Sequence, residues 1–336
     1  MAAPQILTTV VGSYPVPDWL AALPSQQALL DATRVVFKTQ EMAGIDVVAD
    51  GELYRFDVNH PDTNGMIEYF IRPMRGVRSA VTRADIDEFA RQEGMSFRAE
   101  PAGVVEGPID EGTLNLPRDY RRARALTRHP LKFTLTGPHM LSKTLMDHHY
   151  KSKADLALAI GEALAKQVSG LDPQVLQVDE ANITGHPDEA DWAARAINVV
   201  LDAARSPQKA VHLCFGNYGG QSIQRGHWSK LIGFLNQLHT DHVVLEFAFR
   251  GYDELVHFKE LRPKIAIGLG VIDVKVNTVE SPETVAGRIE HAEQILGPGR
   301  VRWVHPDCGF WMNRRSVADR KMDALVQGRD LYLGRR

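Results

Sequence analysis

Four side chains of this 336-residue sequence could together bind a thiophilic metal, and each comes at the end of a short apolar run. His212 and Cys214 are two residues apart, so an extended strand would point both side chains to the same face. Glu246 and Cys308 follow two later apolar runs. Thiolate and imidazole suit Zn²⁺, and a carboxylate can serve as a displaceable fourth ligand. If these runs end at one edge of a sheet, the four residues predict a zinc site.

Simpler interpretations of the two cysteines stay open at this point. A lone buried cysteine is usually a small hydrophobic side chain, and a lone His-x-Cys pair is usually accidental. A redox pair would need a Cys-x-x-Cys motif or a close spacing, and Cys214 and Cys308 have neither. Two cysteines are also too few for a disulfide framework.

Other apolar runs likewise end in groups able to bind ligands or transfer protons. These are Ser13, Glu52, Thr136, Asp179, Glu180, Asp273, Lys275 and Asp307. Random strand ends would carry more Gly, Asn and Ser and fewer carboxylates. The concentration of such groups favours an enzyme whose site lies at the carboxyl ends of its strands.

Eight β-rich runs alternate with helical stretches and must position these groups. The runs are continuous in Val, Ile and Leu, as expected for strands buried on both faces. They cover residues 6–14, 46–52, 131–138, 175–181, 209–216, 242–248, 264–273 and 301–309, and the helices cover 25–43, 152–170, 187–205, 223–238, 252–261, 281–296 and 314–327. Eight strand–helix units predict an α/β fold of the (β/α)₈ TIM-barrel class, with a doubly wound open sheet as the competitor.

Residues 53–129 interrupt this alternation and are too many for a simple βα loop. We expect an insertion after the second strand that lies over the barrel mouth. It would hold helices at 84–93 and 118–127 and a hairpin within SFRAEPAGVVEGPI, residues 96–109. No second core is apparent, so residues 1–336 are predicted to form one catalytic barrel.

The composition limits the partners and the location of the protein. Lys and Arg number 39 against 42 Asp and Glu, giving a formal net charge of −3. Such a balanced chain has no general attraction for nucleic acid or for an anionic membrane. No apolar run is long enough to span a membrane, and the N-terminus has no signal-peptide pattern. We therefore expect a cytoplasmic enzyme with no nucleic-acid or membrane partner.

Taken together, the motifs resemble the catalytic domain of cobalamin-independent methionine synthase. They follow the family's order over nearly the whole chain: VGSYP (11–15), DGE (50–52), GMIEYF (65–70), LTGP (135–138), QVDEA (177–181), HLC (212–214), LEF (245–247), GLGVIDVK (268–275) and HPDCGF (305–310). The resemblance implies a (β/α)₈ barrel with zinc bound by His212, Cys214, Glu246 and Cys308. It also implies that Ser13 helps to hold homocysteine, while Glu52 and Asp179 accept hydrogen bonds from its ammonium group.

The sequence departs from the family pattern on the side of the methyl donor. The family's aspartate-isoleucine-histidine element reads Asp273-Val274-Lys275, and Thr144 stands near the place of a tryptophan that packs on the pterin. We also expect this chain to act without the N-terminal barrel of the long enzyme, which helps to bind polyglutamylated folate. These differences favour a donor other than methyltetrahydrofolate polyglutamate, such as a methylated corrinoid protein.

Asp273 and Lys275 are the predicted catalytic groups on that side. Lys275 could place a cation near the donor, or protonate a leaving group if burial lowers its pKa. An equally good interpretation is that Lys275 pairs with Asp273 or with a neighbouring carboxylate.

Three functions therefore stay open. The leading prediction is zinc-dependent methyl transfer to the thiol of homocysteine, forming methionine. An alternative is alkyl transfer to another thiol such as coenzyme M, as in the epoxyalkane:coenzyme M transferases, which share the His-x-Cys…Cys pattern. Coenzyme M carries a sulfonate and no ammonium, so Glu52 and Asp179 argue against it. The third is a non-catalytic zinc barrel that binds thiols or a protein partner.

Overall fold

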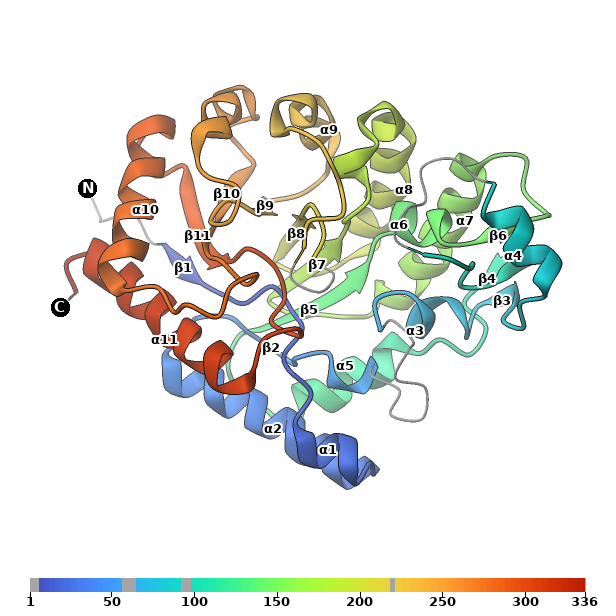
Figure 1. Cartoon of the computed structure of the whole chain (residues 1–336), viewed down its shortest axis with the longest axis horizontal. Coiled ribbons are helices and arrows are strands. Elements are labelled where there is room, and N and C mark those ends of the chain that lie inside the picture. Colours follow the sequence, from blue (N-terminus) through green and yellow to red (C-terminus); the bar gives the residue numbers. More distant parts are fainter. Residues whose placement is uncertain (1–5, 56–64, 92–97, 218–220, 336) are drawn as a thin grey trace.

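Eight parallel strands form a closed ring in the computed structural model, which describes residues 6–55, 65–91, 98–217 and 221–335. The strands pair with their sequence neighbours in one continuous series (Figure 1): β1 (Leu7–Thr8), β2 (Val48–Ala49), β5 (Leu131–Thr136), β7 (Val175–Asp179), β8 (Gln208–Leu213), β9 (His242–Leu245), β10 (Ala266–Ile272) and β11 (Val301–Pro306). β11 pairs with β1, and the bridges Thr9–Val47 and Ser13–Gly51 join β1 to β2. Closure confirms the TIM-barrel prediction and excludes the open sheet.

Helices cover the outside of this ring and bury the main apolar core against it (Figure 1). Those predicted at 25–43, 152–170, 187–205 and 281–296 are present as α2 (Gln26–Ala43), α7 (Lys153–Val168), α8 (Ala190–Ala203) and α10 (Pro282–Leu296). Three begin at a serine cap: Ser25, Ser152 and Ser281 each accept a hydrogen bond from the backbone three residues on. Such caps satisfy N–H groups that the first helical turn leaves free.

Other helix predictions need correction. The segment 223–238 holds only the 3₁₀ turn Trp228–Lys230 and α9 (Ile232–Gln237), and 253–260 is 3₁₀ rather than α-helical. The last helix, α11 (Arg315–Tyr332), continues beyond residue 327. Trp228 explains the first difference, because its fully buried ring packs on Phe215, Phe247 and Phe258 and anchors the chain before α9 begins.

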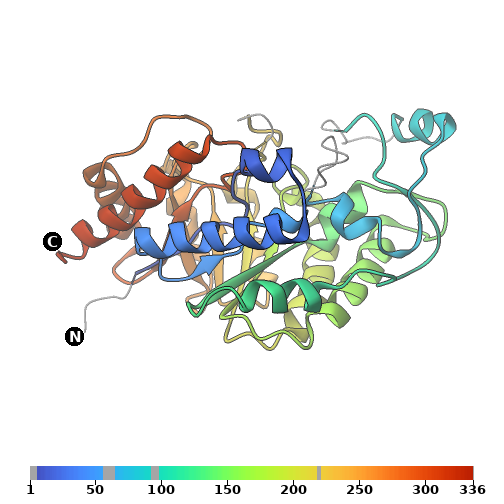
Figure 2. The ribbon, with the colours of Figure 1, turned by 90° about the horizontal axis from the view of Figure 1, so that it is seen from below.

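The segment between β2 and β5 contains α3 (Glu68–Ile71), β3 (Arg75–Arg78), α4 (Arg83–Phe89), β4 (Val104–Asp110) and α5 (Leu116–Arg124). The predicted local hairpin is wrong, because β4 pairs with β3, antiparallel, and with β6 (Met146–Asp147), parallel. Residues 96–97 of that hairpin lie outside the described residues. A small separate core of Phe89, Val104 and Met146 explains these distant partners. Figure 2 shows α4 standing clear of the barrel body, and a role over the mouth stays a prediction.

A chain of buried polar side chains leads toward the mouth of the barrel. Lys132, fully buried on β5, donates from Nζ to the Val10 carbonyl (2.9 Å) and to Gln177 Oε1 (2.7 Å). Gln177 in turn donates from Nε2 to Asp179 Oδ1 at 2.7 Å. Burial lowers the pKa of Lys132 to about 7. A hydrogen-bonded path thus runs from the barrel centre to a carboxylate at its rim.

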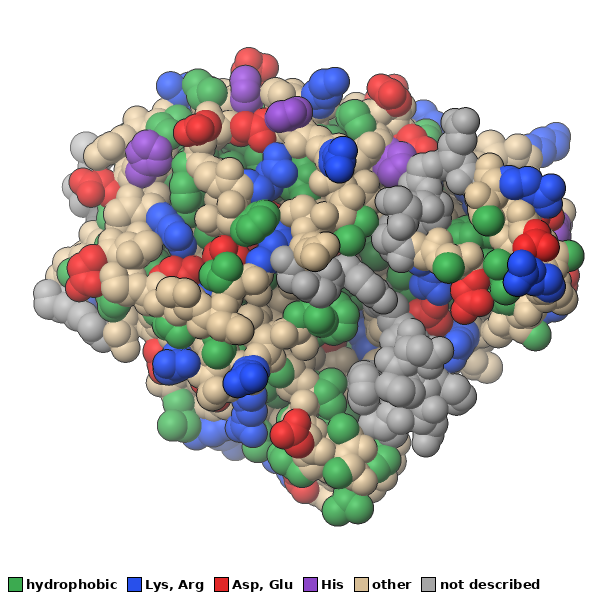
Figure 3. All heavy atoms as spheres, viewed as in Figure 1, with side chains coloured by type: hydrophobic (Ala, Val, Ile, Leu, Met, Phe, Trp, Pro, Cys, Tyr) green, Lys and Arg blue, Asp and Glu red, His purple; other side chains and the backbone are tan. Residues whose placement is uncertain are grey.

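The outer surface carries charges of both signs. Figure 3 shows acidic and basic side chains interspersed over one face, with no large region of a single sign. Within the described parts of the chain, no helix combines the length and apolar character that crossing a bilayer requires.

Candidate metal centre and barrel mouth

Three of the four predicted metal ligands meet at the carboxyl ends of β8 and β11. One ligand atom from each of His212, Cys214 and Cys308 lies within 4.8 Å of the others. His212 is on β8, Cys214 directly follows that strand, and Cys308 comes two residues after β11. β9 and β10 lie between these two strands in the sheet, so the curvature of the barrel brings the three residues together at its mouth.

His212 is oriented with one ring nitrogen toward this group. Its Nδ1 lies 2.9 Å from the Val244 carbonyl oxygen, which makes Nδ1 the protonated nitrogen. Nε2 is buried and has no hydrogen-bond partner among the described residues. A buried polar atom without a partner is costly unless something binds it. The lone pair of Nε2 is therefore available to a metal ion.

The two cysteines are free thiols whose sulfur atoms lie 3.8 Å apart. This distance is far beyond a disulfide bond of about 2.05 Å. The pKa of Cys214 lies well below its usual range, because Cys308 donates a hydrogen bond to its sulfur and the nearby His212 also favours the thiolate. Burial acts in the opposite direction. The Cys214 thiolate and burial raise the pKa of Cys308. The pair therefore holds one thiolate readily and resists a second unless a cation compensates its charge.

Glu246, the fourth predicted ligand, is close but otherwise engaged. It is fully buried and lies outside the group of three. Its Oε2 accepts the backbone N–H of Phe215 at 2.8 Å, and its Oε1 pairs with the Lys275 ammonium. Burial raises the pKa of Glu246, and the charge of Cys214 adds to this rise. A metal-binding role for Glu246 stays a prediction.

Lys275 thus has the carboxylate partner that the second interpretation of the sequence proposed. Its Nζ also donates to Ser222 Oγ at 3.2 Å and lies 4.4 Å from the centre of the Phe249 ring. Asp273 is not part of this ion pair; its carboxylate accepts the backbone N–H of Lys275 at 2.8 Å. Asp273 therefore shapes the turn that directs Lys275 toward Glu246. Catalysis by either residue stays a prediction.

Glu52 and Asp179, the predicted ammonium acceptors, face the same part of the mouth. Glu52 has a φ of 59°, a left-handed conformation that is uncommon outside glycine. Its Oε1 accepts from Thr134 Oγ1 at 2.5 Å and lies 3.4 Å from Arg55 Nη1. Burial, together with the charge of Glu52, raises the pKa of Asp179 to about 7. These carboxylates favour a cationic ligand, which would offset both effects.

Ser13 connects these carboxylates with the cysteine side. It forms a bridge with Gly51, next to Glu52, and its carbonyl accepts the N–H of Phe310 at 2.9 Å. Gly309, adjacent to Cys308, approaches so closely that an added Cβ would lie 2.0 Å from Ser13 Oγ. The structure therefore packs Ser13 between the two groups. Its role in binding substrate stays a prediction.

Sequence reasoning missed Arg55 as part of the mouth. This buried guanidinium donates from Nη2 to the carbonyl oxygen of Thr134 (2.5 Å) and to its Oγ1 (2.9 Å), while Nη1 faces Glu52. The rings of Tyr69 and Phe70 lie 5.6 and 5.1 Å from its Cζ. The available signal was a basic residue three positions after Glu52, in the DGELYR sequence.

Two further carboxylate arrangements hold the mouth loops. Asp307 Oδ1 accepts the N–H groups of Phe247 and Ala248 and its Oδ2 that of Phe249, at 2.7 to 2.9 Å, which shapes the chain directly after Glu246. His139 lies between Glu180 Oε1 (2.9 Å) and Glu189 Oε2 (2.7 Å). Despite its burial, these carboxylates raise the pKa of His139. The second network anchors α6 (Pro138–Lys143) to the barrel.

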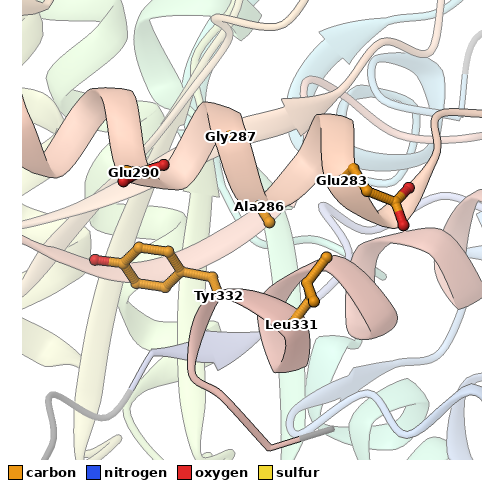
Figure 4. A pocket seen from close by; sticks show the side chains of 6 residues that line it. All are labelled: Glu283, Ala286, Gly287, Glu290, Leu331 and Tyr332. Atoms are coloured by element: carbon orange, nitrogen blue, oxygen red, sulfur yellow. The ribbon is translucent and has the colours of Figure 1, made fainter.

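A shallow surface pocket lies elsewhere, between α10 and α11. Figure 4 shows its lining residues, which are Glu283, Ala286, Gly287, Glu290, Leu331 and Tyr332. They include no thiol, imidazole or cationic side chain. The chemistry-bearing groups belong to the barrel mouth.

The closed (β/α)₈ barrel, with one histidine and two cysteines close together at its mouth, places this protein among TIM-barrel proteins with a possible metal site. The family model described as the cobalamin-independent synthase catalytic domain matches residues 6–329. The chain therefore belongs to the cobalamin-independent methionine synthase catalytic-domain family, as the motifs implied.

Similar proteins agree with this assignment. A methionine synthase from Sulfurisphaera tokodaii is 28% identical over 340 residues, covering 97% of this chain and 92% of its own length. One from Saccharolobus islandicus is 27% identical, with 97% and 94% covered. The solved B12-independent methionine synthase from Shewanella sp. W3-18-1, in complex with selenomethionine, has a TM-score of 0.78 at 23% identity, with 97% of each chain covered. This structural similarity supports the barrel fold.

Proposed function

We propose that this protein is a zinc-dependent methyltransferase that forms methionine by methyl transfer to the thiol of homocysteine. Membership of the family supports methyl transfer as the reaction. The observation that carries the proposal is the pair of thiols beside an unpartnered imidazole nitrogen. Around a tetrahedral zinc ion, two thiolates at about 2.3 Å would be about 3.8 Å apart. The sulfur atoms of Cys214 and Cys308 are separated by 3.8 Å.

His212, Cys214 and Cys308 would hold the metal, with Glu246 the predicted fourth group. Bound zinc would keep the substrate thiol as a thiolate at neutral pH, which is the nucleophile that methyl transfer requires. His212 is suited to this role because the Val244 carbonyl fixes its tautomer and ring orientation.

Glu52 and Asp179 would orient the amino acid part of homocysteine. Both carboxylates would accept charge-assisted hydrogen bonds from its α-ammonium, and Ser13 would complete the contact toward Cys308. Anchoring this end positions the sulfur for in-line attack on an activated methyl carbon. Coenzyme M, the alternative thiol, would place a sulfonate beside two carboxylates. Arg55 offers it little compensation, because Arg55 is already engaged by Glu52 and Thr134.

We further propose that the donor is not methyltetrahydrofolate polyglutamate but a methyl group carried by a partner protein, such as a methylated corrinoid protein. Thr144 is buried and donates to the Leu141 carbonyl at 2.7 Å, so its side chain offers no surface for a pterin. Several large apolar side chains are 43 to 46% exposed on the loops after β9, β10 and β11, namely Phe249, Val276, Trp311 and Met312. An exposed apolar rim beside a reactive site suits a docked protein.

Zinc-edge X-ray absorption, measured with and without homocysteine, tests the proposal. We expect two sulfur ligands in the free protein and three when homocysteine is present. Coenzyme M is the matched control and should leave two. A third sulfur ligand that appears with coenzyme M and not with homocysteine would identify coenzyme M as the substrate thiol. Failure of the purified protein to bind zinc stoichiometrically would refute the mechanism.

A further inference from the structure

Lys132 is a fully buried lysine that lies deeper in the barrel than the predicted ammonium acceptors. In the sheet it is paired with Val175, four residues before Asp179 on β7. Among the described residues, its Nζ donates only to two neutral oxygens, those of Val10 and Gln177. A lysine buried without a hydrogen-bonded carboxylate is costly, so its place in the barrel calls for a physical reason.

The amide of Gln177 is held in one orientation by partners on both of its sides. Its Oε1 accepts from Lys132 Nζ at 2.7 Å, and its Nε2 donates to the Val11 carbonyl at 2.9 Å. An ammonium group only donates and a carbonyl oxygen only accepts, so a flipped amide would lose both hydrogen bonds. In this orientation Nε2 also donates to Asp179 Oδ1, which lies 2.7 Å away.

The orientation of Gln177 in turn fixes the Asp179 carboxylate. A flipped amide would bring its oxygen against Oδ1, and two acceptors at this distance repel each other, so Asp179 would turn away. The N–H of Gln177 instead holds Oδ1 in place, while Oδ2 has no hydrogen-bond partner in the described part of the chain. Oδ2 is therefore available to a cationic ligand.

We propose that Lys132 is a positioning residue for the ammonium end of homocysteine, because it fixes the Gln177 amide and, through that amide, the Asp179 carboxylate. This inference rests on the proposed function, in which Asp179 accepts a hydrogen bond from the α-ammonium. Lys132 itself does not touch the substrate. It affects only the part of the affinity that depends on the amino group.

Lys132→Met tests this role, because it removes the ammonium and keeps a side chain of similar length. Without a donor opposite Oε1, the Gln177 amide is held less firmly and Asp179 loses its fixed placement. We expect the zinc-loaded variant to bind homocysteine about tenfold more weakly, as for the loss of one hydrogen bond. γ-Mercaptobutyrate, which is homocysteine without its amino group, should bind the variant and the wild type equally. Calorimetric titration with each thiol measures both affinities.

Three further variants separate positioning from a general loss of structure. Gln177→Met removes the intermediate group and should also weaken the binding of homocysteine and not that of γ-mercaptobutyrate. In Asp179→Asn, the addition of Lys132→Met should weaken homocysteine binding by less than about twofold more, because the group through which Lys132 acts is already lost. Lys153→Met is the matched control, since Lys153 also donates from a part-buried ammonium to backbone carbonyls. It should bind both thiols as the wild type does.

An unchanged preference for homocysteine over γ-mercaptobutyrate in Lys132→Met would overturn the inference. Equal weakening of both thiols, or full additivity with Asp179→Asn, would overturn it as well. If Lys132→Met does not fold, an unchanged preference in Gln177→Met has the same meaning. In each of these cases, a third sulfur at zinc with homocysteine keeps the proposed function. If the wild type binds the two thiols equally, the inference and the predicted ammonium site both fail.

Discussion

Two halves of the barrel mouth differ in whether their polar groups have partners. At the ends of β8 and β11, His212 Nε2 has no hydrogen-bond partner within the described chain, and Cys214 and Cys308 are free thiols. At the ends of β9 and β10, Glu246 is paired with Lys275, and the Asp273 carboxylate accepts a backbone N–H. Buried polar groups are costly when unpaired, so the first half is arranged for a ligand and the second for support.

This difference separates residues that we expect to bind a ligand from residues that we expect to stabilise the fold. Substitutions in the first half should remove a ligand's affinity at little cost to folding. Substitutions in the second half should lower the free energy of unfolding, because they leave partners buried and unsatisfied.

The largest effect is expected for Cys308→Ala. Loss of one of the proposed metal ligands should remove stoichiometric zinc and lower the rate of methyl transfer by roughly a thousandfold or more. Elemental analysis and steady-state assays would measure both quantities. Asn277→Ala, an exposed change on a neighbouring loop, is the control. Full turnover by Cys308→Ala would contradict zinc catalysis.

Asp307→Ala tests the supporting half, because the Asp307 side chain, although it follows β11, holds the chain directly after β9. Three backbone N–H groups would lose their acceptor, and we expect the free energy of unfolding to fall by about 3 kcal/mol. Urea denaturation of the metal-free protein would measure this change. His212→Ala is the matched comparison and should cost clearly less, because it removes one hydrogen bond, from Nδ1 to the Val244 carbonyl, while Nε2 has no protein partner to lose. Equal losses in the two variants would remove the distinction between the halves.

Asp179→Asn should weaken homocysteine binding by about 30-fold, the loss of one charge-assisted hydrogen bond. The expected change is a higher KM for homocysteine, measured beside a thiol of similar length that lacks the ammonium group. That second thiol should react equally with both proteins. An unchanged KM for homocysteine would exclude Asp179 as its ammonium acceptor.

Homocysteine affinity should also depend on pH through Asp179. Burial and the charge of Glu52 raise its pKa to about 7, so the carboxyl is increasingly protonated as the pH falls below that value. The protonated form carries no charge for the ammonium, and affinity should drop by up to about tenfold per pH unit below 7. Calorimetric titrations from pH 6 to 8 would measure the slope. A flat profile would mean that Asp179 stays ionised or does not contact the ligand.

The smallest effect is expected at the apolar rim. Val276→Ser combined with Met312→Ser should leave the free energy of unfolding within about 0.5 kcal/mol, since both side chains are exposed. The KM for a protein-borne methyl donor should rise only about three- to fivefold, because little apolar area is lost. Transfer from a small methyl donor is the control. Equal kinetics with the protein-borne donor would argue against docking at this rim.

Much of the fold was predictable from local pattern. Continuous apolar runs indicate strands covered on both faces, and serine caps mark the starts of α2, α7 and α10. Glu246 shows the limit of such reasoning. Its residue type is that of a metal ligand, and its partner Lys275 comes from the next strand end, which no local pattern reveals.

The sequence by itself determined the eight strand runs, the helices α2, α7, α8 and α10, and the presence of His212, Cys214 and Cys308 at strand ends. These features depend on residue type, spacing and short-range hydrogen bonds. Only the tertiary structure decided that β4 pairs with β3 and β6, that Arg55 joins the mouth, and that Lys275 engages Glu246. Such contacts join residues that barrel closure brings together, and their energies depend on burial, which exists only once the chain has folded.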